Sequence, residues 1–152
     1  MRPPSGPAGT GVASVAAMGD VVVTRIYQDP GRSAGEVRVL VDRLWPRGIT
    51  RVAADLDEWA KDAAPRPELR RWYAHDVARF AQFRQRYELE LREAPALEAV
   101  AHLRVLAASS RLVLLTAARD VAHSSARVLA DELARVAATS YPPRTSTLWA
   151  SH

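Results

Sequence analysis

The chain of 152 residues contains no cysteine. This absence excludes disulfide bridges, thiolate zinc sites and a cysteine nucleophile, and it fits a cytoplasmic protein. No apolar run approaches the roughly 18 residues of a membrane span, so we expect no membrane partner. The chain also lacks a glycine-rich phosphate loop and the Gly-x-Ser-x-Gly turn of serine hydrolases. His75, His102 and His123 show no local metal-ligand spacing, so the sequence predicts neither a metal nor a cofactor.

Lysine is nearly absent as well. Of the 21 basic residues, only Lys61 is not an arginine, and the net charge is +4. A skew towards arginine together with abundant alanine is typical of a GC-rich genome. Guanidinium groups nevertheless bind carboxylate and phosphate with two parallel hydrogen bonds. The excess charge is too small to require a nucleic acid partner.

The length corresponds to one domain with a substantial core. Residues 1–19 are rich in proline, glycine, alanine and serine, which predicts a disordered extension, and Met18 is a candidate start codon. We expect a single α/β domain over residues 20–138. Residues 139–152 contain Pro142 and Pro143 and are expected to form a tail.

Branched apolar runs predict strands at 21–27, about 36–42 and 112–116. Helical spacing with Asp or Pro start signals predicts helices near 56–63, 67–72, 77–93, from Pro95 onward, and 121–138. The long helical excursion between buried strands is what a parallel crossover requires. The pattern therefore predicts a small three-layer α/β fold, with a mostly parallel sheet of about three or four strands flanked by helices.

Charged and aromatic side chains follow two of these strands directly, in the segments 37–48 and 112–125. In open parallel sheets, ligands bind where strands exit at their carboxyl ends. If the two strands are parallel, one rim of the sheet collects the side chains of Asp42, Arg43, Trp45, Arg47, Arg119, Asp120 and His123.

Each rim residue has a candidate role. Arg43, Arg47 and Arg119 would bind the charge of an anionic ligand. The acid–base candidates are Asp42, Asp120 and His123. The alternatives are structural: Asp42 and Arg43 would form an ion pair, and Asp120 would cap the last helix.

Aromatic side chains also gather in the segments 56–59 and 72–76. With Trp45, the side chains of Trp59, Trp72 and His75 would wall the pocket, on short helices that could close over the rim. An aromatic mini-core is the alternative interpretation.

Five segments resemble, in order, the motifs of the YeaO-like branch of the domain-of-unknown-function 488 family. The resemblance covers residues 21–138 and is carried by the segments 39–48, 56–65, 69–76, 83–87 and 114–123. It implies a bacterial cytosolic α/β protein and names no reaction. Family members often carry Asn-His after the matching histidine, whereas this chain has Ser124 and Ser125, so a two-histidine site is not expected here.

Three functions remain open. The first is a rim site for a small phosphate or carboxylate ligand, used either by an enzyme with acid–base chemistry or by a binding protein. The second is a nucleic-acid-associated protein that uses arginine for phosphate and Trp or Tyr for stacking. This second function is disfavoured because the most arginine-rich helix is interrupted by Glu88, Glu90 and Glu93. The third is a non-catalytic interaction domain. No sequence feature predicts an oligomeric state.

Overall fold

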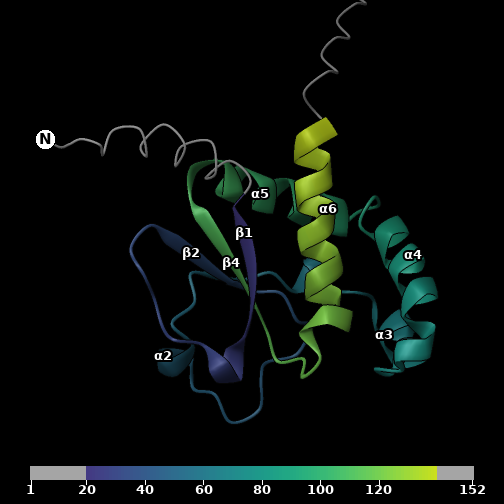
Figure 1. Cartoon of the computed structure of the whole chain (residues 1–152), viewed down its shortest axis with the longest axis horizontal. Coiled ribbons are helices and arrows are strands. Elements are labelled where there is room, and N and C mark those ends of the chain that lie inside the picture. Colours follow the sequence, from purple (N-terminus) through teal and green to yellow (C-terminus); the bar gives the residue numbers. More distant parts are fainter. Residues whose placement is uncertain (1–19, 140–152) are drawn as a thin grey trace, which may run out of the picture.

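Four parallel strands form the central sheet of the computed structural model, which describes residues 20–139 (Figure 1). The strands are β1 (Val21–Arg25), β2 (Glu36–Leu40), β3 (Glu58–Trp59) and β4 (Arg111–Thr116), in the order β1-β4-β2-β3. Every neighbouring pair is parallel, which confirms the predicted fold class. All the carboxyl ends therefore lie at one edge of the sheet.

The sheet is apolar because β4 and the end of β2 are covered on both faces. Leu112 to Leu115 are at most 4% exposed, and Val39, Leu40 and Val41 are almost fully buried. Val41 donates its N–H to the Leu115 carbonyl, so the ladder continues past the end of β2. Continuous branched apolar runs of this kind are typical of parallel strands buried on both sides.

Four helices lie on one side of the sheet and share a core with it: α3 (Pro67–Tyr73), α4 (Phe80–Glu90), α5 (Ala96–Ser109) and α6 (Ser125–Thr139). Figure 1 shows α6 running along the sheet with α4 outside it. The other face is covered by α2 (Arg51–Ala54), the 3-10 turn Ile26–Gln28 and the chain around Trp45 and Ile49. The molecule thus has the three layers that the sequence predicts, one of them thin.

The prediction of a helix near 56–63 is wrong. The helix lies earlier, at α2, where the Thr50 hydroxyl accepts a hydrogen bond from the Ala53 N–H at 3.0 Å. Asp55 ends α2 in the left-handed conformation, and Glu58 and Trp59 then pair with β2 as the short edge strand β3. Strand pairing overrides local helical preference here. Only a 3-10 turn remains at Lys61–Ala63.

Two other predicted helices begin with a 3-10 turn. The helix near 77–93 consists of the turn Val77–Arg79 followed by α4, and the predicted cap Asp76 accepts from the Ala78 N–H at 3.1 Å. The last helix is preceded by the turn Val121–His123. Ser124 caps α6, because its hydroxyl accepts from the Arg127 N–H at 3.2 Å.

A buried arginine fixes α2 and the loop after β1 to the sheet. The side chain of Arg38 on β2 is 1% exposed, and its two terminal nitrogens lie 3.1 and 2.5 Å from the carboxylate oxygens of Asp29. Its Nε donates to the Asp55 carbonyl at 2.7 Å. Arg32 forms ion pairs with Asp55 and Asp57 at 3.0 and 3.1 Å. We call these five residues the Arg38 cluster.

The predicted N-terminal extension and the C-terminal tail beyond residue 139 lie outside the described residues. Within residues 20–139, no helix has the length and apolar character needed to cross a membrane.

Candidate functional site

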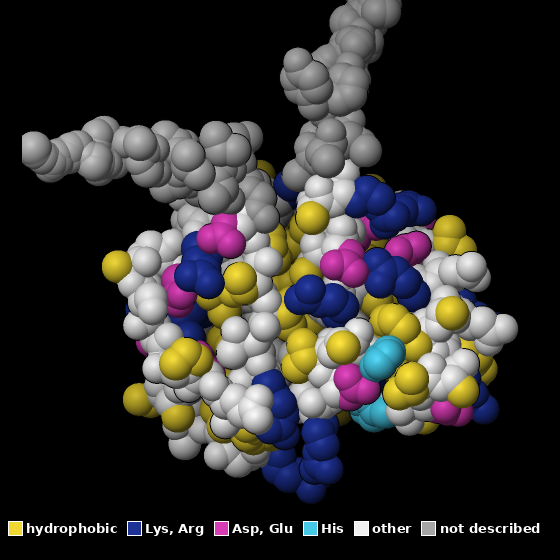
Figure 2. Space-filling view, viewed as in Figure 1, with side chains coloured by type: hydrophobic (Ala, Val, Ile, Leu, Met, Phe, Trp, Pro, Cys, Tyr) yellow, Lys and Arg dark blue, Asp and Glu magenta, His cyan; other side chains and the backbone are white. Residues whose placement is uncertain are grey.

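A pocket of about 620 Å³ opens at the carboxyl end of the sheet. It is lined by the ends of β1 and β4, the turn after β2, the end of α3 and the start of α6. Figure 2 shows Lys and Arg side chains projecting at the lower edge of the molecule, the end at which β1 runs into its 3-10 turn in Figure 1. Five arginines but only two carboxylates line this pocket, which we call the rim pocket: Arg25, Arg43, Arg47, Arg70 and Arg119, with Asp42 and Asp120.

Asp42 joins the two central strands at the floor of the rim pocket. One carboxylate oxygen accepts from the Thr116 hydroxyl and the other from the Ala117 N–H, both at 2.7 Å. Burial raises the pKa of Asp42, and these two hydrogen bonds oppose the rise. Because both oxygens already accept hydrogen bonds, Asp42 holds the ends of β2 and β4 in register.

Arg43 does not pair with Asp42 as the structural alternative expects. Its Nε donates to the Pro65 carbonyl at 3.2 Å and its Nη2 to the Ala64 carbonyl at 3.2 Å. These bonds fix the chain before α3 against the turn after β2. Arg43 therefore lines the rim pocket with part of its guanidinium group committed to the backbone.

The other rim arginines are less constrained. In the described part of the chain, the side chains of Arg47, Arg70 and Arg119 are exposed and form no ion pair or side-chain hydrogen bond. Arg25 lies over the ring of Tyr27, with its guanidinium carbon 4.9 Å from the ring centroid. Its Nε is buried and has no hydrogen-bond partner among residues 20–139. A buried donor without an acceptor is costly, so this nitrogen lowers the stability of the fold at this point.

Asp120 and His123 contact each other at the margin of the pocket. The His123 Nδ1 lies 2.8 Å from an Asp120 carboxylate oxygen. The imidazole also packs edge-on against Phe80, with 5.0 Å between the ring centroids, and is not among the residues that line the pocket. Asp120 lines the pocket, but its side chain does not cap the helix as the structural alternative expects.

The predicted aromatic wall is only partly present. Trp45 lines the rim pocket and donates its Nε1–H to the Ile49 carbonyl at 2.6 Å. Trp59 lies outside the pocket lining, where it packs edge-on against Trp45 at 5.3 Å and donates to the Asp42 carbonyl at 2.8 Å. Trp72 also lies outside it, and the guanidinium of Arg86 covers its ring at 4.3 Å.

His75 lines the pocket at the end of α3, where the backbone is strained. Ala74 and His75 both have positive φ angles, 48° and 61°. Such conformations are unfavourable for residues with a Cβ atom and often occur at functional sites. Just before them, burial raises the pKa of Tyr73, and its hydroxyl donates to the His123 carbonyl at 2.6 Å. This bond ties α3 to the turn before α6.

The lining includes charged and aromatic residues that the sequence pattern did not predict, among them Arg25, Tyr27 and Arg70. The first two follow from the same rule that located the rim, because they stand at the carboxyl end of β1. Arg70 lies on α3, and no local pattern distinguishes it from the neighbouring Arg71. In the part of the chain that the structure describes, no three His, Cys, Asp or Glu side chains gather as metal ligands.

Comparison with known proteins gives consistent matches. The family model DUF488-N3i, described as the inactive DUF488-N3 subclade, matches residues 20–147. An uncharacterised protein of Mycobacterium tuberculosis H37Rv is 46% identical over 99 residues, which cover 65% of this chain and 80% of that protein. The uncharacterised protein YeaO of Escherichia coli K12 is 46% identical over 67 residues, which cover 44% of this chain and 57% of YeaO. These matches confirm the resemblance that the motifs indicate, and no solved structure matches.

Proposed function

We propose that this chain, which belongs to the inactive DUF488-N3 subclade, binds a small phosphate or carboxylate ligand in the rim pocket and catalyses no reaction there. The observation that carries the proposal is the charge of the lining, with five arginines against two carboxylates. Both carboxylates are already engaged, Asp42 with Thr116 and Ala117, and Asp120 with His123. The arginine charge thus remains available to an anion.

The arrangement of the acid–base candidates supports binding without catalysis. The His123 ring packs on Phe80 and contacts Asp120, so it does not face a ligand in the pocket. Both oxygens of Asp42 accept hydrogen bonds within the protein. The Ser124 hydroxyl is engaged with the backbone, because it donates to the Val121 carbonyl at 2.7 Å and accepts from the Arg127 N–H at 3.2 Å. Membership of the inactive DUF488-N3 subclade agrees with this arrangement.

The distribution of charge favours a small ligand over a nucleic acid strand. A nucleic acid surface requires a basic stripe that extends well beyond one pocket. On α4 and α6, however, Arg84 lies 3.1 Å from Glu88 and 2.9 Å from Asp131. Arg92 lies 3.4 Å from Glu132. These arginines are paired with carboxylates, whereas Arg47, Arg70 and Arg119 of the rim pocket have no such partner among the described residues.

A thermal-shift screen of phosphorylated and carboxylated metabolites tests this proposal, followed by calorimetric titration of any compound that raises the melting temperature. A ligand that binds only the folded state must stabilise it. We expect Arg47→Ala and Arg119→Ala each to weaken binding about tenfold or more, as expected for the loss of a charge-assisted hydrogen bond.

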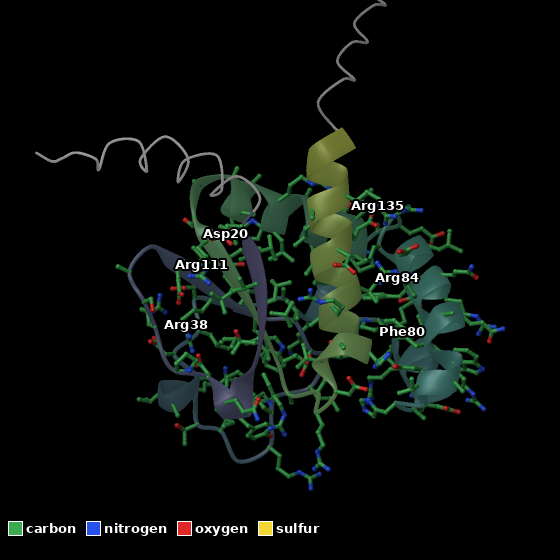
Figure 3. The ribbon with its side chains drawn as sticks, viewed as in Figure 1. Asp20, Arg38, Phe80, Arg84, Arg111 and Arg135 are labelled. Atoms are coloured by element: carbon green, nitrogen blue, oxygen red, sulfur yellow. The ribbon has the colours of Figure 1, made fainter. Side chains whose placement is uncertain are left out.

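The matched control is Arg111→Ala, which removes an exposed arginine 3.6 Å from Asp20; Figure 3 shows this pair at the upper end of the sheet. This variant should bind like the wild type. Equal binding by all three variants would contradict the proposed site. Conversion of the ligand, followed by NMR and abolished in His123→Ala, would show an enzyme instead of a binding protein.

A further inference from the structure

Beyond a generic anion, we infer that the rim pocket accepts a phosphate monoester that carries a planar aromatic group, the chemistry of a nucleoside monophosphate. This inference rests on the proposed function and specifies its ligand class. It draws on three features: the charge of the lining, the volume of the pocket, and an aromatic ring at its edge that is held in place yet left exposed.

The charge of the lining fits a dianion better than a single carboxylate. Three exposed arginines that have no carboxylate partner within residues 20–139 line one pocket together with Arg25: Arg47, Arg70 and Arg119. A phosphate monoester carries about −1.5 to −2 charges at neutral pH, and its oxygens accept several hydrogen bonds at once. Arg25 also lines the pocket, so its guanidinium group adds positive charge beside these three.

The pocket is too large for the anionic group alone. Its volume of about 620 Å³ lies within the range of roughly 300–1,000 Å³ of pockets that hold whole organic ligands. Part of the lining is apolar and accessible: in the turn after β2, Leu44 is 60% exposed and Trp45 is partly exposed. An organic group attached to the phosphate would cover these side chains.

Tyr27 supplies a preorganised stacking surface. Its hydroxyl donates to the Arg47 carbonyl at 2.7 Å, and the guanidinium group of Arg25 lies over its ring. These two contacts orient the ring, yet Tyr27 remains 42% exposed at the edge of the pocket. By contrast, the ring of Tyr73 is stacked on Phe83 at 4.2 Å and is buried. Tyr27 is thus the tyrosine of the lining whose ring can still receive a planar group.

Calorimetric titration of the full-length protein with four probes tests the inference: inorganic phosphate, ribose 5-phosphate, adenosine and adenosine 5′-monophosphate. We expect adenosine 5′-monophosphate to bind about tenfold more tightly than ribose 5-phosphate, because stacking of a base on an aromatic side chain contributes about that factor. Adenosine should bind more weakly than its monophosphate. These comparisons use the unmodified protein and do not depend on the folding of a variant.

Two variants of Tyr27 localise the effect. Tyr27→Ala should weaken binding of adenosine 5′-monophosphate about tenfold and leave ribose 5-phosphate within about twofold, because only the first ligand has a ring to stack. Tyr27→Phe, the matched control, keeps the ring and loses the hydrogen bond to the Arg47 carbonyl, so it should retain most of the affinity.

The outcomes separate this inference from the proposal beneath it. Equal affinity for adenosine 5′-monophosphate and ribose 5-phosphate would show that the aromatic group is not recognised, and the proposal of anion binding would still hold. Binding of adenosine that is as tight as that of adenosine 5′-monophosphate would show that the phosphate is not recognised. If neither inorganic phosphate, ribose 5-phosphate nor adenosine 5′-monophosphate binds, the proposed function fails as well. A 5′-phosphorylated trinucleotide that outcompetes the mononucleotide, with its unphosphorylated form inactive, would identify a nucleic acid end as the source of the same chemistry.

Discussion

The Arg38 cluster and the rim pocket both contain arginines, but carboxylates surround these arginines very differently. In the cluster, Arg38 lies against Asp29, and Arg32 against Asp55 and Asp57. In the rim pocket, Arg47 and Arg119 have no carboxylate partner among the described residues. Guanidinium groups that are neutralised hold the fold together, whereas those left unpaired at a pocket are available to a ligand.

Removing Arg38 should have the largest effect on stability. Arg38→Met leaves the Asp29 carboxylate, whose side chain is 11% exposed, without its partner. Breaking a buried ion pair at one side destabilises a protein by about 3–5 kcal/mol. Urea unfolding at neutral pH measures the change, with Arg111→Met as the exposed control. A loss no larger than that of the control would show that the cluster contributes little.

Acid should also destabilise the Arg38 cluster, but by less than Arg38→Met does. Protonation removes the charge of Asp29, whereas the substitution leaves that charge without a partner. The hydrogen bonds from Arg38 lower the pKa of Asp29. The stability that this carboxylate contributes is present above its ordinary pKa of roughly 4 and is lost as the pH falls through the lower folded value. Unfolding free energies measured from pH 6 to pH 2 should fall less steeply in Asp29→Asn than in the wild type. Parallel curves would contradict this account.

In the rim pocket, the contribution of Asp42 to the unfolding free energy should depend on pH in the opposite direction. Burial raises the pKa of Asp42, so its contribution is fully present below the unfolded value and is lost as the pH rises through the raised folded value. Acidification from pH 7 towards pH 4 should therefore stabilise the wild type relative to Asp42→Asn. The difference between their unfolding free energies measures this contribution, and a constant difference across that range would rule it out.

The two regions also differ in backbone strain. Both α2 and α3 end in a left-handed residue, Asp55 in the Arg38 cluster and Ala74 at the rim pocket. Aspartate tolerates this conformation better than alanine does, and glycine is the usual residue at such helix ends. Ala74→Gly should therefore stabilise the protein by about 0.5–1 kcal/mol. Thermal unfolding measures the gain, and a lower melting temperature would show that Ala74 carries no strain.

The smallest expected effect on stability comes from the rim arginines themselves. Arg119→Ala removes an exposed side chain without a described partner, so the unfolding free energy should stay within about 0.5 kcal/mol of the wild type. The same variant is expected to lose ligand affinity. A large loss of stability would show that Arg119, like Arg38, stabilises the fold.

Strand positions and the rim followed from the sequence because both depend on local pattern. The apolar runs before Asp42 and after Arg111 indicate buried strands, and parallel strands deliver their next residues to one edge. β3 could not be predicted in this way, since its two residues are a strand only through pairing with Val39 and Leu40. The same holds for α2, whose four residues are too few for a periodic signal.

The roles of the rim residues depend on contacts made across the chain. Arg43 is predicted to bind an anion, and the sequence does not reveal that its Nε and Nη2 also donate to the Pro65 and Ala64 carbonyls. Trp59 is predicted to wall the pocket, yet its ring lies outside the pocket lining and its Nε1–H donates to the Asp42 carbonyl. Neither partner is close in sequence, and composition carries no information about which carbonyl a side chain reaches. The anion-binding roles of Arg47 and Arg119 stay predictions.

The strand order has a consequence for how the protein is assembled. β1 and β2 are consecutive in the chain but do not pair with each other, because β4 lies between them. A chain still lacking β4 therefore has no sheet joining β1 to β2, and Asp42 lacks both Thr116 and Ala117 as donors. Contacts this distant in sequence form late and slow the folding of a domain. Ligand binding at the rim would thus report that synthesis and folding have been completed through β4.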